Sequence, residues 1–171
     1  MAEVVVQIAK NFKDIDVRLH KLEELVKAIC NRFTRNEKRP LPTTSRGVIP
    51  AKAGTKYEIS IAIVDDAEIR KVNKQFLNRK STADCLSFDL SDNDTEGAPK
   101  SFELVVNAEV AVKEANLRGH SSEAELALYI THGLLHHLGF DDSEPEQAKK
   151  MHRTEDEILQ QLGYGPVYNS K

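Results

Sequence analysis

One segment of the chain, THGLLHHLGFDDSE at residues 131–144, has the residue types and spacing of a metal site. His132 and His136 are four residues apart, so on a helix they differ by about 40° after a full turn and project from one face. Gly139 can adopt the left-handed backbone that ends a helix and reverses the chain. Asp142 follows where a third ligand is needed. The spacing predicts a metal ion held by His132, His136 and Asp142.

The competing interpretation is that the histidines are ordinary helix residues and that Asp141 and Asp142 merely open a polar turn. The same stretch contains three leucines and a phenylalanine, which predicts a largely buried helix. Imidazoles in such a setting are costly without a shared partner, which favours the metal site. Asp141 is predicted to orient a ligand histidine by a hydrogen bond. His137 lies about 100° round the helix from His136, so we expect it to be exposed or to support a ligand rather than bind the ion.

The donor types indicate which metal is bound and what it does. Two imidazoles and a carboxylate suit zinc, with iron, nickel and manganese as alternatives. Three protein ligands leave a position open for water, as in catalytic zinc sites, and bound water can ionise near neutral pH and attack an electrophile. We therefore expect a metal-assisted hydrolase with one Zn²⁺ per chain. The sequence identifies no general base.

Zinc proteases of the metzincin type share part of this spacing. Their motif is H-E-x-x-H-x-x-G-x-x-H, and its glutamate is the general base. Gly133 stands at the glutamate position here. Because glycine cannot take a proton from water, a metalloprotease is the least favoured alternative.

The segment HGLLHHLGFDD resembles the signature of the YbeY family of bacterial endoribonucleases, which is close to H-G-x-L-H-L-x-G-Y-D-H. The resemblance extends to three further segments and covers roughly residues 57–168. These segments are DDAEIRKVNKQF followed by DCLSFDL, VVNAEVAVKEA, and MHRTEDEILQQLGY.

The resemblance implies a zinc-dependent endoribonuclease specific for single-stranded RNA. Such an enzyme acts in rRNA maturation and ribosome quality control, in the cytoplasm, with rRNA and the small ribosomal subunit as partners. Neither a membrane nor DNA is an expected partner. The alternative from another class is a ribosome-biogenesis factor that binds RNA, holds a structural metal and cleaves weakly or not at all.

Two departures from the family pattern bear on activity. Asp142 replaces the third histidine, and an anionic ligand makes the metal a weaker Lewis acid. Leu77 stands where the family has an arginine, so a donor to phosphate oxygens is missing there. Arg79 and Lys80 are the candidate phosphate contacts in its place.

The charge distribution adds a second source of phosphate contact. The net charge is −3 for 171 residues, yet residues 32–56 hold seven basic residues against Glu37, and residues 69–80 hold five with no acid. Local basic segments on an acidic protein are compatible with a phosphate-binding surface, although charge alone favours a solvated face and a flexible linker. We hypothesise that the 34–55 segment supplies some of the lost phosphate contact.

The remaining pattern predicts how the chain positions these residues. It favours an α+β fold in one domain, with a four-stranded mixed sheet flanked by about five helices. Strands are expected at VVVQIA, 57–64, 84–90 and 102–110. Helices are expected at 16–33, from Asp65–Asp66 to Leu77, and from the end of the 102–110 strand to Asn116. Two more are expected from Ser121 or Ser122 to Leu138 and from Pro145 to Leu162. Glu125, three residues after Ser122, is expected to form a capping box at the start of the first of these two. Residues 34–55, rich in proline and glycine, are predicted to be a long flexible loop. No apolar run is long enough to span a bilayer, no secretory signal is expected at the start, and the two cysteines are expected to be buried or half-buried thiols.

Overall fold

The computed structural model describes residues 2–34 and 54–167 of the chain. Within these ranges the elements are, in chain order, β1 (Glu3–Lys10), α1 (Leu19–Thr34), β2 (Lys56–Val64), α2 (Asp66–Leu77), β3 (Cys85–Asp89), β4 (Lys100–Asn107), α3 (Ala108–Arg118), α4 (Ser122–His137) and α5 (Pro145–Gln161). The predicted α+β class, with a four-stranded mixed sheet and helices around it, is confirmed. The predicted loop at residues 34–55 lies almost wholly outside the described residues.

The sheet has the strand order β1-β2-β4-β3. β2 pairs in parallel with both β1 and β4, whereas β3 pairs antiparallel with β4. The alternation of buried and exposed residues along β2 reflects the two-residue period of a strand and turns Ile59, Ile61 and Ile63 toward one face.

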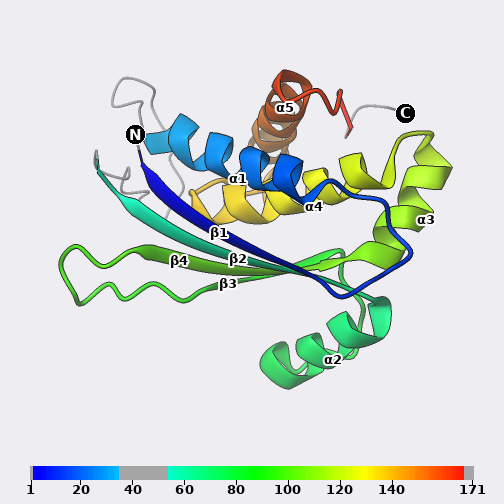
Figure 1. The fold of residues 1–171 in the computed structure, drawn as a ribbon, viewed down its shortest axis with the longest axis horizontal. Helices are drawn as coiled ribbons and strands as arrows, with labels where there is room; N and C mark the ends of the chain where they lie inside the picture. The colour runs from blue at the N-terminus through cyan, green and yellow to red at the C-terminus, as the bar shows by residue number, and fades with distance from the viewer. Residues whose placement is uncertain (1, 35–53, 168–171) are drawn as a thin grey trace.

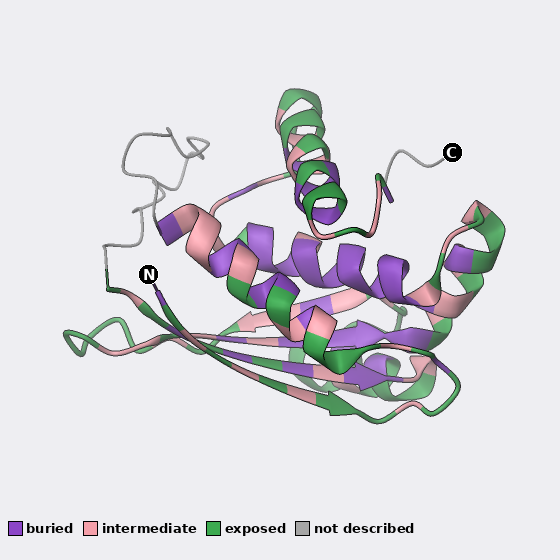
Figure 2. Cartoon of the chain, turned by 45° about the horizontal axis from the view of Figure 1, so that its top comes forward, coloured by how far each residue is buried: buried purple, intermediate pink, exposed green. Residues whose placement is uncertain are grey.

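The helices cover the two faces of the sheet unequally. α1 and α4 lie against one face, α5 packs over α4 on the side away from the sheet, and α2 alone lies beneath the other face (Figure 1). α4 is therefore the central helix of the molecule, and its residues from Glu123 to Leu135 are nearly all buried (Figure 2). A helix apolar all round is expected for an element enclosed in this way.

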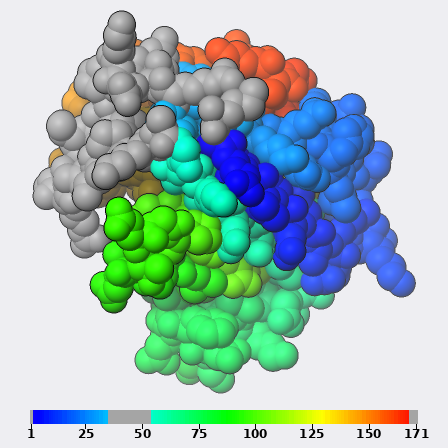
Figure 3. Space-filling model, turned by 60° about the vertical axis from the view of Figure 1, so that its left-hand side comes forward, coloured from blue at the N-terminus to red at the C-terminus, as the bar shows by residue number. Residues whose placement is uncertain are grey.

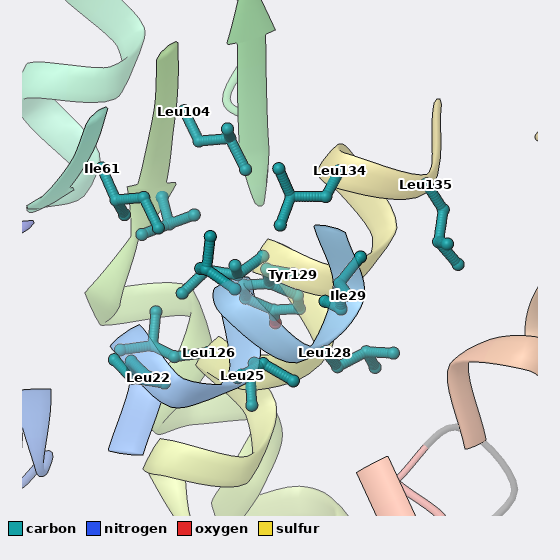
Figure 4. Packing of buried hydrophobic residues seen from close by; sticks show 14 of the residues in the cluster. Leu22, Leu25, Ile29, Ile61, Leu104, Leu126, Leu128, Tyr129, Leu134 and Leu135 are labelled. Carbon is teal, nitrogen blue, oxygen red and sulfur yellow. The ribbon is translucent and has the colours of Figure 1, made fainter. Parts of the chain in front are cut away.

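The main core forms between the sheet and the two helices above it. Figure 4 shows side chains of α1, α4 and the strands meeting in this layer, among them Leu22, Leu25, Ile29, Ile61, Leu104, Leu126, Tyr129 and Leu134. Burial of large apolar side chains contributes roughly 1.5–3 kcal/mol each. This core fixes α4, and with it the predicted ligand histidines, relative to the sheet.

A smaller apolar layer lies under the sheet and holds α2. Val64, Leu86 and Val105 meet Ile69 of α2 there. In the space-filling view α2 forms a ridge below the sheet, while β1 lies at the surface beside α1 (Figure 3). Phe76 follows the helical spacing of Ile69 and Val72 but is 63% exposed, and its ring contacts Phe88 edge to face.

Three local predictions were wrong, the first because of a tertiary contact and the other two because of local helix caps. α1 begins at Leu19 rather than near Asp16, because the backbone N–H of Arg18 donates to Glu123 at 2.6 Å. β4 ends at Asn107, whose side chain caps α3 by accepting from the Val110 N–H. The capping box of α4 is absent as well.

Ser121 caps α4 by accepting a hydrogen bond from the N–H of Ala124. Glu125, expected to complete a capping box, is instead buried and pairs with His120 and Arg118.

Cys30 is buried and Cys85 half-buried, as expected, and both are free thiols. Among the helices in the described part of the chain, none is long and apolar enough to cross a bilayer.

Candidate metal centre

The end of α4 brings the predicted ligands together. His132 and His136 lie on the last two turns of α4, which ends at His137. Gly139 takes a φ of +99°, a left-handed conformation open mainly to glycine, and the N–H of Phe140 bonds back to the carbonyl of Leu135 at 3.0 Å. The reversed chain returns Asp142 to the two histidines.

The donor groups of His132, His136 and Asp142 lie close together at the end of α4, in a cluster that we call the ligand triangle. The Nε2 atoms of His132 and His136 are 3.1 Å apart. Asp142 Oδ2 lies 3.5 Å from His132 Nε2, and the other oxygen, Oδ1, lies 3.6 Å from His136 Nε2. A tetrahedral ion with ligand bonds of about 2.05 Å spaces its donors by about 3.3 Å, so this triangle fits one zinc-sized ion. The donor set and its spacing are those of a three-ligand metal site.

One side of the triangle faces solvent. The side chains of His132, His136 and Asp142 are 29%, 36% and 39% exposed. The ligands therefore stand at the surface, with room for water or a substrate oxygen at a fourth position. This is the geometry expected of a catalytic site rather than a closed structural one.

Neighbouring groups fix the ring orientation of each histidine. Nδ1 of His132 lies 2.5 Å from the carboxylate of Glu155 in α5, and Nδ1 of His136 lies 3.2 Å from the backbone carbonyl of Phe140. An acceptor at Nδ1 holds the proton there and leaves Nε2 free to ligate. Both Nε2 atoms accordingly point at the ligand triangle.

The Glu155 contact also changes the acidity of His132. Burial alone would lower the pKa of His132, but the hydrogen bond and charge of Glu155, with the charges of Asp142 and Asp84, raise that pKa above its ordinary value. A proton therefore competes with a metal for His132 at higher pH than for an isolated histidine.

The orienting role predicted for Asp141 falls to other groups. The Asp141 carboxylate accepts hydrogen bonds from the backbone N–H and hydroxyl of Ser143, at 3.1 and 2.9 Å, and these bonds lower its pKa. His137 is also placed differently from the prediction, since its ring stacks on Phe102 with centroids 4.5 Å apart. His137 thus belongs to the packing between α4 and the sheet.

Sequence reasoning missed two residues of the site, Glu155 and His152. The Glu155 carboxylate is shared between Nδ1 of His132 and Nδ1 of His152, at 2.5 and 2.9 Å. A signal was available, because Met151, Glu155, Ile158 and Leu159 follow the helical spacing of a buried stripe. A carboxylate in an apolar stripe indicates a specific partner, although the sequence does not say which.

A pocket of about 430 Å³ adjoins the metal centre. His132, His152 and Glu155 line one part of it, and the rest is lined mainly by residues of α3, of α4 and of the segment before β3. Its charged side chains are four carboxylates and one arginine, namely Asp84, Glu114, Glu125, Glu155 and Arg118. Arg118 already lies 3.7 Å from Glu114 and 3.6 Å from Glu125. The pocket interior is thus acidic and offers little attraction to phosphate.

The predicted phosphate contacts lie near this pocket rather than inside it. Arg79 and Lys80 are exposed and precede the pocket-lining Thr82 by three and two residues, a reach of at most about 10 Å. The connecting segment is held to α2 by the bond from the Asn73 amide to the Ser81 carbonyl at 2.8 Å. Leu77, at the family's arginine position, is 44% exposed.

Ion pairs reduce the positive charge of both basic segments. Arg70 pairs with Asp66, Lys71 with Glu68, Arg32 with Glu157 and Lys56 with Glu3. Within the described residues, Lys74, Arg79 and Lys80 are the exposed cations of 69–80 with no acidic partner at ion-pair distance. These three side chains, rather than the whole run, are the unpaired positive charge of residues 69–80.

Gly133, the residue after His132, faces the sheet. A Cβ added to Gly133 would lie 3.0 Å from Leu104 Cδ2 and 3.1 Å from Cys85 Sγ. A glutamate there would have to displace core side chains of β3 and β4. The structure therefore excludes a metzincin-type base at residue 133 by packing as well as by residue type.

Comparison with known proteins agrees with this geometry. The family model described as Endoribonuclease YbeY matches residues 7–163, which is most of the chain. The chain belongs to the YbeY family. The YbeY signature at residues 132–142 is the same segment that forms the ligand triangle.

Individual YbeY proteins show the same relationship. The Endoribonuclease YbeY of Myxococcus xanthus is 33% identical over 75% of this chain and 45% of its own length. Those of Anaeromyxobacter sp. and Alkaliphilus metalliredigens are each 34% identical, over 75% and 63% of this chain and over 67% and 72% of their own lengths. The chain thus matches under half of the Myxococcus protein and about two thirds or more of the other two.

A solved structure supports the fold alone. A Thermotoga maritima protein determined in solution superimposes with a TM-score of 0.53 at 21% identity, covering 92% of this chain and 91% of its own.

Proposed function

We propose that this protein is a zinc-dependent endoribonuclease that cleaves single-stranded segments of rRNA during maturation and quality control of the ribosome in the cytoplasm. The observation that carries the proposal is the cluster of His132, His136 and Asp142, whose donor atoms lie 3.1–3.6 Å apart, in the YbeY signature segment. YbeY relatives bear the name of endoribonucleases, which supports RNA as the substrate class.

The residues present fit a bound zinc ion. When bound, such an ion supplies Lewis-acid activation of water and offsets charge on the phosphodiester. His132, His136 and Asp142 would hold it, and their partial exposure leaves the opposite side open to substrate. Asp142 contributes a negative charge where the family has a neutral histidine, which weakens the Lewis acid.

The protein's own charges determine how RNA approaches. Because the pocket beside His132 is lined by four carboxylates, the RNA backbone is expected to stay outside it. Arg79 and Lys80 at its rim are the candidate phosphate contacts, and they hold the strand across the ligand triangle. Small-subunit rRNA is the partner that the family implies.

A single-turnover assay tests this proposal. Wild-type protein with equimolar Zn²⁺ is incubated with an unstructured 5′-labelled RNA oligonucleotide, with His136→Ala as the matched variant. We expect wild type to cleave and His136→Ala to cleave at least about 100-fold more slowly, as is typical when a metal-centred catalyst is disrupted. Equal rates for the two proteins would assign the cleavage to a contaminant and refute the proposal.

A second candidate function is an RNA-binding factor of ribosome biogenesis with weak or no cleavage. It is favoured by Leu77, an exposed apolar residue where the family has an arginine, and by the carboxylate at residue 142. In the same assay this alternative predicts that both wild type and His136→Ala bind the labelled RNA and that neither cleaves it.

A further inference from the structure

The carboxylate of Glu155 is a fully enclosed charged group beside the metal centre. Glu155 lies on α5, its residue is 0% exposed, and each of its oxygens has a histidine partner. Oε1 lies 2.5 Å from Nδ1 of His132 and Oε2 lies 2.9 Å from Nδ1 of His152. The bond to His132 spans 23 residues of sequence and joins α5 to α4.

Packing does not explain a carboxylate at this position. Met151, Ile158 and Leu159 of α5 enter the main core beside Glu155, and Asp156 is the other buried carboxylate of this helix. Taking a carboxylate out of water costs several kcal/mol unless it is paired, and an apolar residue of similar volume often serves stability as well or better. The charge of Glu155 is therefore better explained by an effect on the two histidines that it contacts, His132 and His152.

We propose that Glu155 is a positioning residue that sets the affinity of the metal centre through His132. This inference rests on the proposed function, since it assumes that His132 is a metal ligand. The carboxylate accepts a hydrogen bond from the Nδ1–H of His132. This bond fixes the tautomer and leaves the Nε2 lone pair directed at His136 and Asp142. Carboxylates that orient ligand histidines in this way typically change metal affinity about 10–100-fold.

His152 completes the arrangement by holding the second oxygen of Glu155. Its ring lies nearly parallel to that of His132, with centroids 6.2 Å apart and planes 13° from each other. Because the carboxylate is held by hydrogen bonds at both oxygens, its position is fixed. The orientation of the His132 ring, which bonds to it, is therefore fixed too. His136 is oriented only by the neutral carbonyl of Phe140 at 3.2 Å, a longer and weaker contact. His132 is thus the pre-organised ligand of the centre.

The first test measures Zn²⁺ affinity of the full chain by isothermal titration calorimetry, with no substrate present. The variants are Glu155→Gln, Glu155→Met and His152→Ala. The matched control is Glu125→Gln. Glu125 is a buried carboxylate of α4 that also pairs with a histidine, but its partner is His120 and not a residue of the ligand triangle. We expect about 10–100-fold weaker binding for Glu155→Met, a smaller loss for Glu155→Gln and His152→Ala, and no more than about a twofold change for Glu125→Gln.

Glu155→Met separates positioning from folding. Methionine fills a similar volume without charge, so this variant is expected to melt at or above the wild-type temperature while its Zn²⁺ affinity falls. Glu155→Asp, which keeps the charge on a shorter side chain, is expected to recover part of that affinity. A stable Glu155→Met variant with wild-type affinity would overturn the inference.

A spectroscopic readout follows the tautomer directly. In ¹⁵N-labelled metal-free protein, at a pH where the His132 ring is neutral, its spectrum is expected to show the proton on Nδ1, and Glu155→Met is expected to lose that preference. Loss of affinity without a change in the His132 signals would contradict positioning through His132. If wild type itself binds no Zn²⁺, the proposed function fails, whereas wild-type binding that no Glu155 variant weakens defeats only this inference.

Discussion

At the scale of single residues, the centre differs from the family signature at Asp142. Its carboxylate oxygens are placed as ligand atoms, 3.5 and 3.6 Å from the two Nε2 atoms, so the substitution conserves the site while changing its charge. Asp142→Ala is expected to weaken Zn²⁺ binding more than 100-fold, roughly beyond the range for groups that only orient a ligand. Asp142→His is expected to keep the metal and to raise the cleavage rate by making the ion more electrophilic.

Calorimetry with Zn²⁺ and single-turnover cleavage, run on both variants, check this prediction. Asp141→Ala is the matched control, because the Asp141 carboxylate bonds to Ser143 and not to a ligand histidine. If Asp141→Ala loses the metal and Asp142→Ala keeps it, the third ligand has been assigned to the wrong aspartate.

A second prediction at this scale concerns pH. The pKa of metal-free His132 is raised, chiefly by Glu155 acting against the effect of burial, so protonated His132 persists above the usual histidine range near pH 6.5. Protonation of a ligand opposes metal binding. Apparent Zn²⁺ affinity should therefore rise with pH through pH 7 and level off above the pKa of His132.

Titrations at half-unit steps from pH 5.5 to 8.5 measure this profile. Glu155→Met removes the group that raises the pKa, so its profile should level off at lower pH. A wild-type affinity independent of pH across this range would show that no histidine gives up a proton on binding.

At the scale of elements, α4 and its close approach to the sheet position the ligands. Gly133 allows that approach, because a Cβ there would meet Leu104 and Cys85 at 3.0 and 3.1 Å. Gly133→Val is expected to destabilise the fold by about 1–3 kcal/mol, the usual cost of overpacking, despite the gain in helix propensity over glycine. Thermal unfolding measures this effect.

The double variant Gly133→Val with Cys85→Ala removes one of the two contacting side chains and should recover part of the loss. If Gly133→Val alone matches wild type in its midpoint, α4 does not depend on close approach at this residue.

The elements were largely predictable from sequence, but the contacts between them were not. The periodicity of hydrophobic residues, the helix caps and the glycines that end helices located the strands and helices. The spacing of His132, His136 and Asp142 predicts a common site because all three lie within one helix end and the turn after it. Glu155 reaches His132 from another helix, so no local pattern reveals it. The start of α1 was misplaced for the same reason, since Glu123 of α4 fixes it.

At the scale of the whole molecule, charge decides where RNA can lie. The pocket is acidic, several basic residues are paired, and Lys74, Arg79 and Lys80 remain exposed without an acidic partner at ion-pair distance. The chain also has four basic residues between 36 and 52 against Glu37, in a part of the sequence outside the described residues. Deleting residues 36–52 is expected to weaken binding of single-stranded RNA at low salt.

The same deletion should reduce the salt dependence of binding, by up to about 3 in the log–log slope if all four basic residues contact phosphate. Fluorescence anisotropy between 50 and 200 mM salt measures both effects. The control is Lys149→Ser with Lys150→Ser, which removes exposed charge from α5 without touching either basic segment. Unchanged affinity at low salt after the deletion would refute a role for residues 36–52 in phosphate contact.

The metal content of the purified protein tests the central claim most directly. Inductively coupled plasma mass spectrometry of wild type after extensive dialysis is expected to find close to one zinc per chain, and the variant with both His132→Ala and His136→Ala, confirmed as folded by circular dichroism, is expected to contain almost none. Equal metal content in the two proteins would contradict the claim that the end of α4 and the turn after it form a metal-binding site.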